Sequence, residues 1–179
     1  MAQPAHADFA GLHVLVLDED GAAYLSLKRQ LSGLGVGAVT RAQSPEEALK
    51  VFRTSKIDAL VTELYLPFIK YLRTSPKTPN REVPIIVSSG CQHVRMIRAA
   101  RDAGIDAYVS RATTPAQLGR YLRDALRRDR RFIASRAYYG PDRRHHDSID
   151  FHGDERRGMA GIRTRLAKLD RHYQGARVA

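Results

Sequence analysis

The chain of 179 residues has a single cysteine and contains no long hydrophobic run. Since Cys91 stands alone, an intrachain disulfide is excluded. Every apolar run is far shorter than the roughly 18 residues that a membrane-spanning helix needs. Residues 1–11 also lack the basic and then apolar layout of a secretory signal peptide. We therefore expect a cytoplasmic protein without a transmembrane segment.

Acidic residues are in deficit, with 19 Asp and Glu against 30 Lys and Arg, which gives a formal net charge of +11. Residues 131–179 alone carry eleven of the basic and six of the acidic residues. A basic excess favours anionic partners, such as nucleic acids, nucleotides, phosphates or a membrane surface.

Short apolar runs alternate with helical patterns along the first 130 residues. This alternation predicts an α/β fold, a doubly wound five-stranded parallel sheet of the flavodoxin type. Strong helix starts support it, with a Ser or Thr N-cap followed by Pro at Ser44-Pro45 and Thr114-Pro115. The expected strands cover residues 13–17, 36–42, 58–64, 83–88 and 107–110. We expect a domain over residues 12–130, between a flexible N-terminus (1–11) and a basic, partly disordered or helical extension (131–179).

Polar side chains lie at or directly after the carboxyl ends of these strands, where doubly wound folds place their functional cleft. They are Asp18, Glu19, Asp20, Glu63, Ser88, Ser89 and Arg111. We expect these side chains to meet at one edge of the sheet.

The order and spacing of these motifs over residues 12–128 resemble the receiver domain of bacterial response regulators, including the stand-alone chemotaxis type. The resemblance rests on Asp58 to Pro67, on Pro84 to Gly90 and on Gly104 to Ala112. It implies a Mg²⁺-holding acidic pair at Asp18 and Glu19, and it puts Glu63 at the position of the phospho-accepting aspartate. It further implies switch positions at Ser89 (hydroxyl), Tyr108 (rotating aromatic) and Arg111 (in place of lysine).

The departures from that family pattern predict a receiver that does not use aspartyl phosphorylation. Glutamate is one methylene longer than aspartate, which displaces the nucleophilic oxygen of Glu63 by about 1 Å and can cost on the order of 10²-fold in rate. The Gly-containing loop of the family is replaced by a helix-like segment, Phe68 to Leu72. The planar fork of Arg111 could pair bidentately with Glu63 and imitate the phosphorylated site permanently. Two hypotheses remain open, a locked switch and a degenerate cleft kept only for stability.

In either case we expect no required cofactor, and Mg²⁺ binding at Asp18 and Glu19 only as a vestige.

The extension repeats one motif thirteen residues apart, Tyr138 to Arg144 and Phe151 to Arg157. Each copy combines an aromatic residue, a glycine, an acid and two arginines. Arginine forks suit phosphates and guanine edges, and aromatic rings stack on bases. The extension also resembles the arginine-rich segment of receiver-like cyclic di-GMP effectors of alphaproteobacteria, which act on the flagellar motor. The candidate nucleotide-binding residues are Arg131, Arg136, Tyr139, Asp142, Arg143, Arg144, Arg156 and Arg157.

The expected function is that of a non-enzymatic signalling adaptor, since the sequence has no nucleophile–base pair and no phosphate loop. Its tail would bind cyclic di-GMP, and its receiver face would bind a partner such as the flagellar motor or a chemosensory component. The alternative is a phosphorelay-associated receiver that acts by protein–protein interaction only, with the tail as a non-specific nucleic-acid or membrane anchor. Specific DNA binding is not expected, because there is no helix-turn-helix pattern. His145, His146 and His152 with Cys91 match no strong zinc signature.

Overall fold

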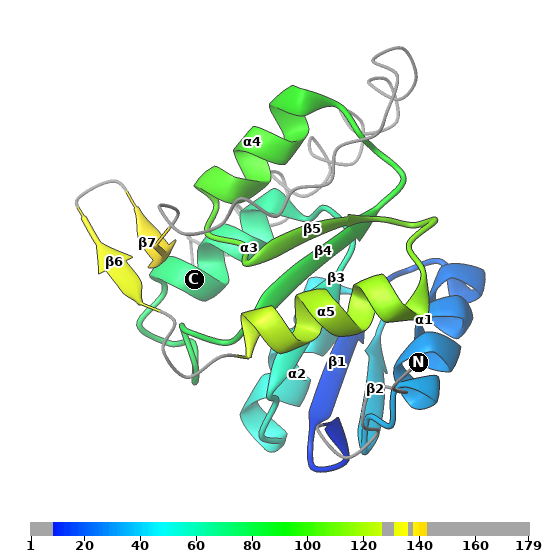
Figure 1. Cartoon of the computed structure of the whole chain (residues 1–179). Helices are drawn as coiled ribbons and strands as arrows, with labels where there is room; N and C mark the ends of the chain where they lie inside the picture. Colours follow the sequence, from blue (N-terminus) through cyan, green and yellow to red (C-terminus); the bar gives the residue numbers. More distant parts are fainter. Residues whose placement is uncertain (1–8, 127–130, 136–137, 143–179) are drawn as a thin grey trace.

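The computed structural model describes residues 9–126, 131–135 and 138–142 of the chain. Its central feature is a parallel five-stranded sheet with the strand order β2-β1-β3-β4-β5. Strands and helices alternate along the chain (Figure 1), as the sequence predicts for a doubly wound receiver-like fold. The elements are β1 (His13–Leu17), α1 (Gly21–Gly33), β2 (Ala38–Ala42), α2 (Pro45–Thr54), β3 (Ala59–Thr62), α3 (Leu66–Thr74), β4 (Ile85–Ser89), α4 (Val94–Asp102), β5 (Ala107–Ser110) and α5 (Pro115–Ala125).

Helices cover both faces of the sheet, so the central strands are apolar on both sides. On one face α2, α3 and α4 pack on side chains such as Leu15, Leu60 and Ile85. On the other face α1 and α5 pack on the alternate residues, among them Val16 and Val61. Burial on both faces is the reason that these strands read as continuous hydrophobic runs.

Side-chain caps fix where several helices begin. Ser44 accepts a hydrogen bond from the Glu47 backbone, and Thr114 forms a full capping box with Gln117. Both residues are the N-caps that the sequence predicts. Two further caps were not expected: Asp20 at α1 and His93 at α4. No helix among the described residues is both long enough and apolar enough to cross a membrane.

A short antiparallel hairpin of β6 (Phe132–Ala134) and β7 (Tyr139–Pro141) follows α5 and packs beside α3 (Figure 1). The backbone of Gly140 approaches that of Gly104, and a Cβ on Gly140 would lie 2.9 Å from the Gly104 Cα. At the other end of the domain, Phe9 is buried. The folded part of the chain therefore extends beyond the expected range 12–130 at both ends.

Candidate functional site

An acidic cluster around one arginine occupies the carboxyl edge of the sheet. Arg111, directly after β5, places its Nη2 atom 3.1 Å from Asp18 Oδ2 and 3.2 Å from Glu63 Oε1. Its Nη1 atom lies 3.8 Å from Asp20 Oδ2. The Asp18 side chain is 2% exposed, that of Glu63 15% and that of Arg111 32%. The sheet thus brings together three residues that are far apart in the sequence.

The expected contact between Glu63 and Arg111 is present, through Oε1 and Nη2. The same nitrogen also donates to Asp18 Oδ2. Asp18 is almost fully buried, and a buried carboxylate needs a charged or hydrogen-bonding partner. It therefore competes with Glu63 for the guanidinium, and the fork is divided between neighbouring strands.

The loop after β1 is held from both sides. Asp18 Oδ1 accepts the backbone N–H of Asp20 at 2.9 Å, and Asp20 Oδ1 accepts those of Ala22 and Ala23. These backbone hydrogen bonds lower the pKa of Asp20 below its ordinary value.

Arg41, at the end of β2, fixes the backbone of the same loop. Its guanidinium donates to the carbonyl oxygens of Asp18 and Glu19 at 3.1–3.4 Å. The Glu19 side chain is exposed, whereas Asp18 and Asp20 face Arg111. Sequence reasoning missed Arg41, although its place at the end of the strand beside β1 was a usable signal.

The two other switch positions meet around Cys91 in the loop after β4. The buried hydroxyl of Tyr108 donates to the Cys91 carbonyl, and Ser89 Oγ accepts the Cys91 N–H at 3.2 Å. Burial raises the pKa of Tyr108 to about 12. Ser89 and Tyr108 therefore fix the start of the segment that leads into α4.

The oxygens of this cleft do not fit a divalent metal ion as they are arranged. Within the described ranges, no group of three or more His, Cys, Asp or Glu side chains could hold a metal. The Glu63 carbonyl accepts from the Tyr65 N–H at 2.8 Å and from Thr62 Oγ1 at 2.9 Å. The Tyr65 carbonyl accepts the first hydrogen bond of α3, from Ile69 at 3.0 Å. Helix α3 therefore begins only three residues after Glu63, where the sequence predicts a helix-like segment instead of a glycine loop.

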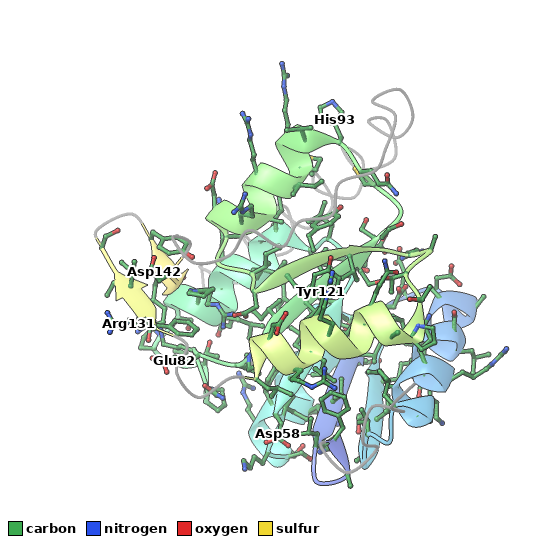
Figure 2. The ribbon with its side chains drawn as sticks, viewed as in Figure 1. Asp58, Glu82, His93, Tyr121, Arg131 and Asp142 are labelled. Carbon is green, nitrogen blue, oxygen red and sulfur yellow. The ribbon has the colours of Figure 1, made fainter. Side chains whose placement is uncertain are left out.

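The described part of the candidate nucleotide site lies at the other edge of the sheet. The Tyr139 ring lies 4.1 Å from the Arg81 guanidinium, and its hydroxyl donates to Glu82 at 2.9 Å. Figure 2 shows Glu82, Arg131 and Asp142 near the hairpin, well away from His93 at the cleft end of α4. The hairpin closes with the Asp142 N–H donating to the Arg131 carbonyl at 2.8 Å.

The remaining candidates of the tail lie outside the described residues. They are Arg136, Arg143, Arg144, Arg156 and Arg157, and their role in nucleotide binding stays a prediction. The histidines 145, 146 and 152 also lie outside the described residues.

A family model and curated relatives both match this chain to the same family. The model of the response regulator receiver domain matches residues 14–123. Response regulator MprA of Mycolicibacterium vanbaalenii is 31% identical over 119 residues, which cover 65% of this chain and 51% of that protein. The chain spans about half the length of the curated relatives that it matches.

Solved structures agree with this result. A response regulator structure from Chloroflexus aurantiacus J-10-fl matches with a TM-score of 0.59 and 26% identity, over 64% of this chain and 97% of that one. The receiver domain of sensor histidine kinase PA1611 from Pseudomonas aeruginosa PAO1, which has a magnesium ion coordinated in its active site cleft, has the same fold. It matches with a TM-score of 0.58 and 20% identity, over 65% of this chain and 98% of that one. The chain therefore belongs to the response regulator receiver domain family, a family of signalling modules.

Proposed function

We propose that this receiver signals by binding partner proteins and does not accept a phosphoryl group. The observation that carries the proposal is the ion pair between Glu63 Oε1 and Arg111 Nη2 at 3.2 Å, shared with Asp18. A carboxylate engaged by a guanidinium is a weaker nucleophile than a free one. The longer side chain of Glu63 also displaces that oxygen by about 1 Å, a misplacement that can cost on the order of 10²-fold in rate.

The proposal is tested by incubation of the full chain with acetyl phosphate and Mg²⁺, followed by intact mass spectrometry. We expect no phosphoryl adduct on the wild-type protein. The double variant Glu63→Asp, Arg111→Lys carries the usual residues of the family at both positions and serves as the matched control. A stable adduct on Glu63 or Asp18 of the wild-type chain would contradict the proposal.

This proposal has two forms, a switch locked in one signalling state and a degenerate cleft kept only for stability. The contacts favour the locked switch. Arg111 is bound at the cleft, while Tyr108 is buried with its hydroxyl on the Cys91 carbonyl. If these contacts act as one unit, Arg111→Lys should shift NMR signals from the cleft through Tyr108 into α4. Shifts confined to the immediate neighbours of residue 111 would instead indicate a degenerate cleft that only supports stability.

We further propose that the tail binds a guanine nucleotide second messenger, cyclic di-GMP. The repeated pairs Arg143–Arg144 and Arg156–Arg157 support this, since arginine forks suit phosphate and guanine oxygens. The ring of Tyr139 already faces Arg81, so the proposal assigns the nucleotide contacts to the arginine pairs and not to stacking on Tyr139.

Calorimetric titration of the full chain with cyclic di-GMP, GMP, cyclic di-AMP and a duplex oligonucleotide tests this part. We expect selective binding of cyclic di-GMP that is lost in Arg143→Ala and Arg156→Ala. An exposed arginine of α2, changed in Arg53→Ala, is the charge-matched control and should bind as the wild type does. Equal affinity for all four ligands that moderate salt abolishes would favour the alternative function, a non-specific electrostatic anchor.

The proposed partner of the receiver face is a component of the flagellar motor or of a chemosensory system, which places the protein in the cytoplasm. The resemblance of the tail to receiver-like effectors supports this choice. Direct binding of the purified chain to isolated flagellar basal bodies, with and without cyclic di-GMP, is the measurement. Absence of binding under both conditions would remove the motor from the proposal and leave the receiver function untouched.

A further inference from the structure

We propose that Arg111 is the resident cation of the acidic cleft, that it keeps Mg²⁺ out, and that loss of its charge turns the cleft into a Mg²⁺ site. This inference deepens the proposed function and rests on it. It concerns metal binding and not phosphotransfer, so the two can fail separately.

The first support is the position of the guanidinium. Nη2 lies 3.1 Å from Asp18 Oδ2 and 3.2 Å from Glu63 Oε1, and Nη1 faces Asp20 Oδ2. A Mg²⁺ ion binds carboxylate oxygens at about 2.0–2.1 Å. An ion on Asp18 Oδ2 could therefore lie no more than about 5 Å from Nη2, where two like charges repel each other.

The second support is that this cation is covalently tethered. The Arg111 backbone N–H donates to the Ser89 carbonyl at 3.2 Å, which fixes the residue at the junction of β4 and β5. Its Nε atom is buried, so the stem of the side chain lies inside the cleft wall. A tethered group acts at a high effective concentration that a dissolved ion has to overcome.

The third support comes from the backbone around Glu63. A Mg²⁺ ion requires near-octahedral coordination by oxygen atoms. The Glu63 carbonyl already accepts hydrogen bonds from Thr62 and Tyr65, and the Tyr65 carbonyl accepts one from Ile69 in α3. The cleft therefore offers carboxylates that pair with Arg111 and backbone oxygens that already have donors.

The cleft also needs a cation, which explains the gain of function that we expect. Asp18 is 2% exposed, and Asp20 and Glu63 lie on the same guanidinium. Removing the charge of Arg111 leaves the buried carboxylate of Asp18 and that of Glu63 without the cation that they share. Proteins usually hold Mg²⁺ through one or two carboxylates while the ion keeps several of its water molecules.

The test is a titration of the full-length wild type, Arg111→Gln and Arg41→Gln with MgCl2, followed by calorimetry and thermal unfolding. Arg41→Gln is the control for loss of a nearby positive charge, since Arg41 donates its hydrogen bonds to backbone carbonyls of the same loop and its charge acts on Asp20 only at a distance. We expect Arg111→Gln to bind Mg²⁺ at least about tenfold more tightly than the wild type. Its melting temperature should rise with Mg²⁺, whereas those of the wild type and Arg41→Gln should not change. Equal Mg²⁺ affinity of the wild type and Arg111→Gln, or the same gain in Arg41→Gln, overturns the inference.

A second measurement needs no variant and therefore does not depend on the folding of Arg111→Gln. Mn²⁺, a paramagnetic substitute for Mg²⁺, is titrated into the wild-type chain under NMR observation. We expect no selective broadening of the Asp18 and Glu63 signals. Selective broadening there at micromolar Mn²⁺ refutes the inference, and it leaves the proposed function standing if acetyl phosphate still gives no adduct.

Discussion

Replacing Asp106 by asparagine removes one half of an ion pair that is buried on both sides. Arg73 Nη2 lies 3.0 Å from Asp106 Oδ2, and each side chain is 1% exposed. The same oxygen accepts the Ile85 N–H at 2.7 Å, so the pair joins the end of α3 to the starts of β4 and β5. Phe132 of the hairpin packs over the Arg73 guanidinium with its ring centre at 5.3 Å.

The loss of stability in Asp106→Asn depends on the hydrogen-bond acceptors that Arg73 retains. Removing one partner of a buried ion pair costs about 3–5 kcal/mol, because a charge stays buried without compensation. Arg73 retains three backbone acceptors, the carbonyls of Arg81, Val83 and Gly104 at 2.7–2.8 Å. Asparagine can still offer an oxygen to Ile85. We therefore expect Asp106→Asn to lower the free energy of unfolding by about 3 kcal/mol, the low end of that range.

Urea unfolding followed by circular dichroism measures this loss. With an m-value of about 2 kcal/mol/M, the midpoint should fall by about 1.5 M without a change in m. Lys56→Ala is the control, since Lys56 lies 3.5 Å from Asp58 but is 91% exposed, and exposed pairs contribute no more than about 1 kcal/mol. A loss in Asp106→Asn that is no larger than the loss in Lys56→Ala would refute the reasoning.

Two further changes test other parts of the structure. The pKa of Tyr108 is raised to about 12, so the folded state resists an ionisation that the unfolded state undergoes near its ordinary value of 10. The free energy of unfolding should then fall by about 1.4 kcal/mol per pH unit between pH 10 and 12. Tyr108→Phe should flatten this slope when unfolding is measured against pH. An unchanged slope in Tyr108→Phe would show that Tyr108 is not its cause. In Gly140→Ala the new Cβ would lie 2.5 Å from the Tyr138 hydroxyl and 2.9 Å from the Gly104 Cα, so we expect a loss of about 1–3 kcal/mol in urea unfolding. Gly33→Ala, where nothing lies within 4 Å of the new atom, should be neutral or stabilising by up to about 1 kcal/mol, and equal losses in the two variants would contradict the close approach of the hairpin.

The fold was predictable because its strands are short apolar runs with strong helix caps between them. Ser44 and Thr114 cap their helices in the structure as their sequence context indicates. The hairpin was not predictable, since β6 and β7 have only three residues each and one of them contains a proline. Such short strands have no periodicity, and their stability comes from packing on the receiver.

The candidate site was predictable where the topology alone decides it. Strand order puts the residues after β1, β3 and β5 at one edge, so the meeting of Glu63 and Arg111 followed from the sequence. The ion pair of Asp18 with the same guanidinium could not be predicted from the sequence, because it depends on the directions of the side chains. The burial of Arg73 was equally hidden, although its spacing of four residues from Ile69 puts it on the apolar side of α3.

The docked hairpin makes the two copies of the tail motif unequal. Tyr139 and Gly140 of the first copy pack against Arg81 and Gly104. The last described residue, Asp142, lies at this hairpin near Glu82 and away from His93 (Figure 2). The aromatic residue and the glycine of this first copy therefore hold the hairpin on the receiver surface beside α3.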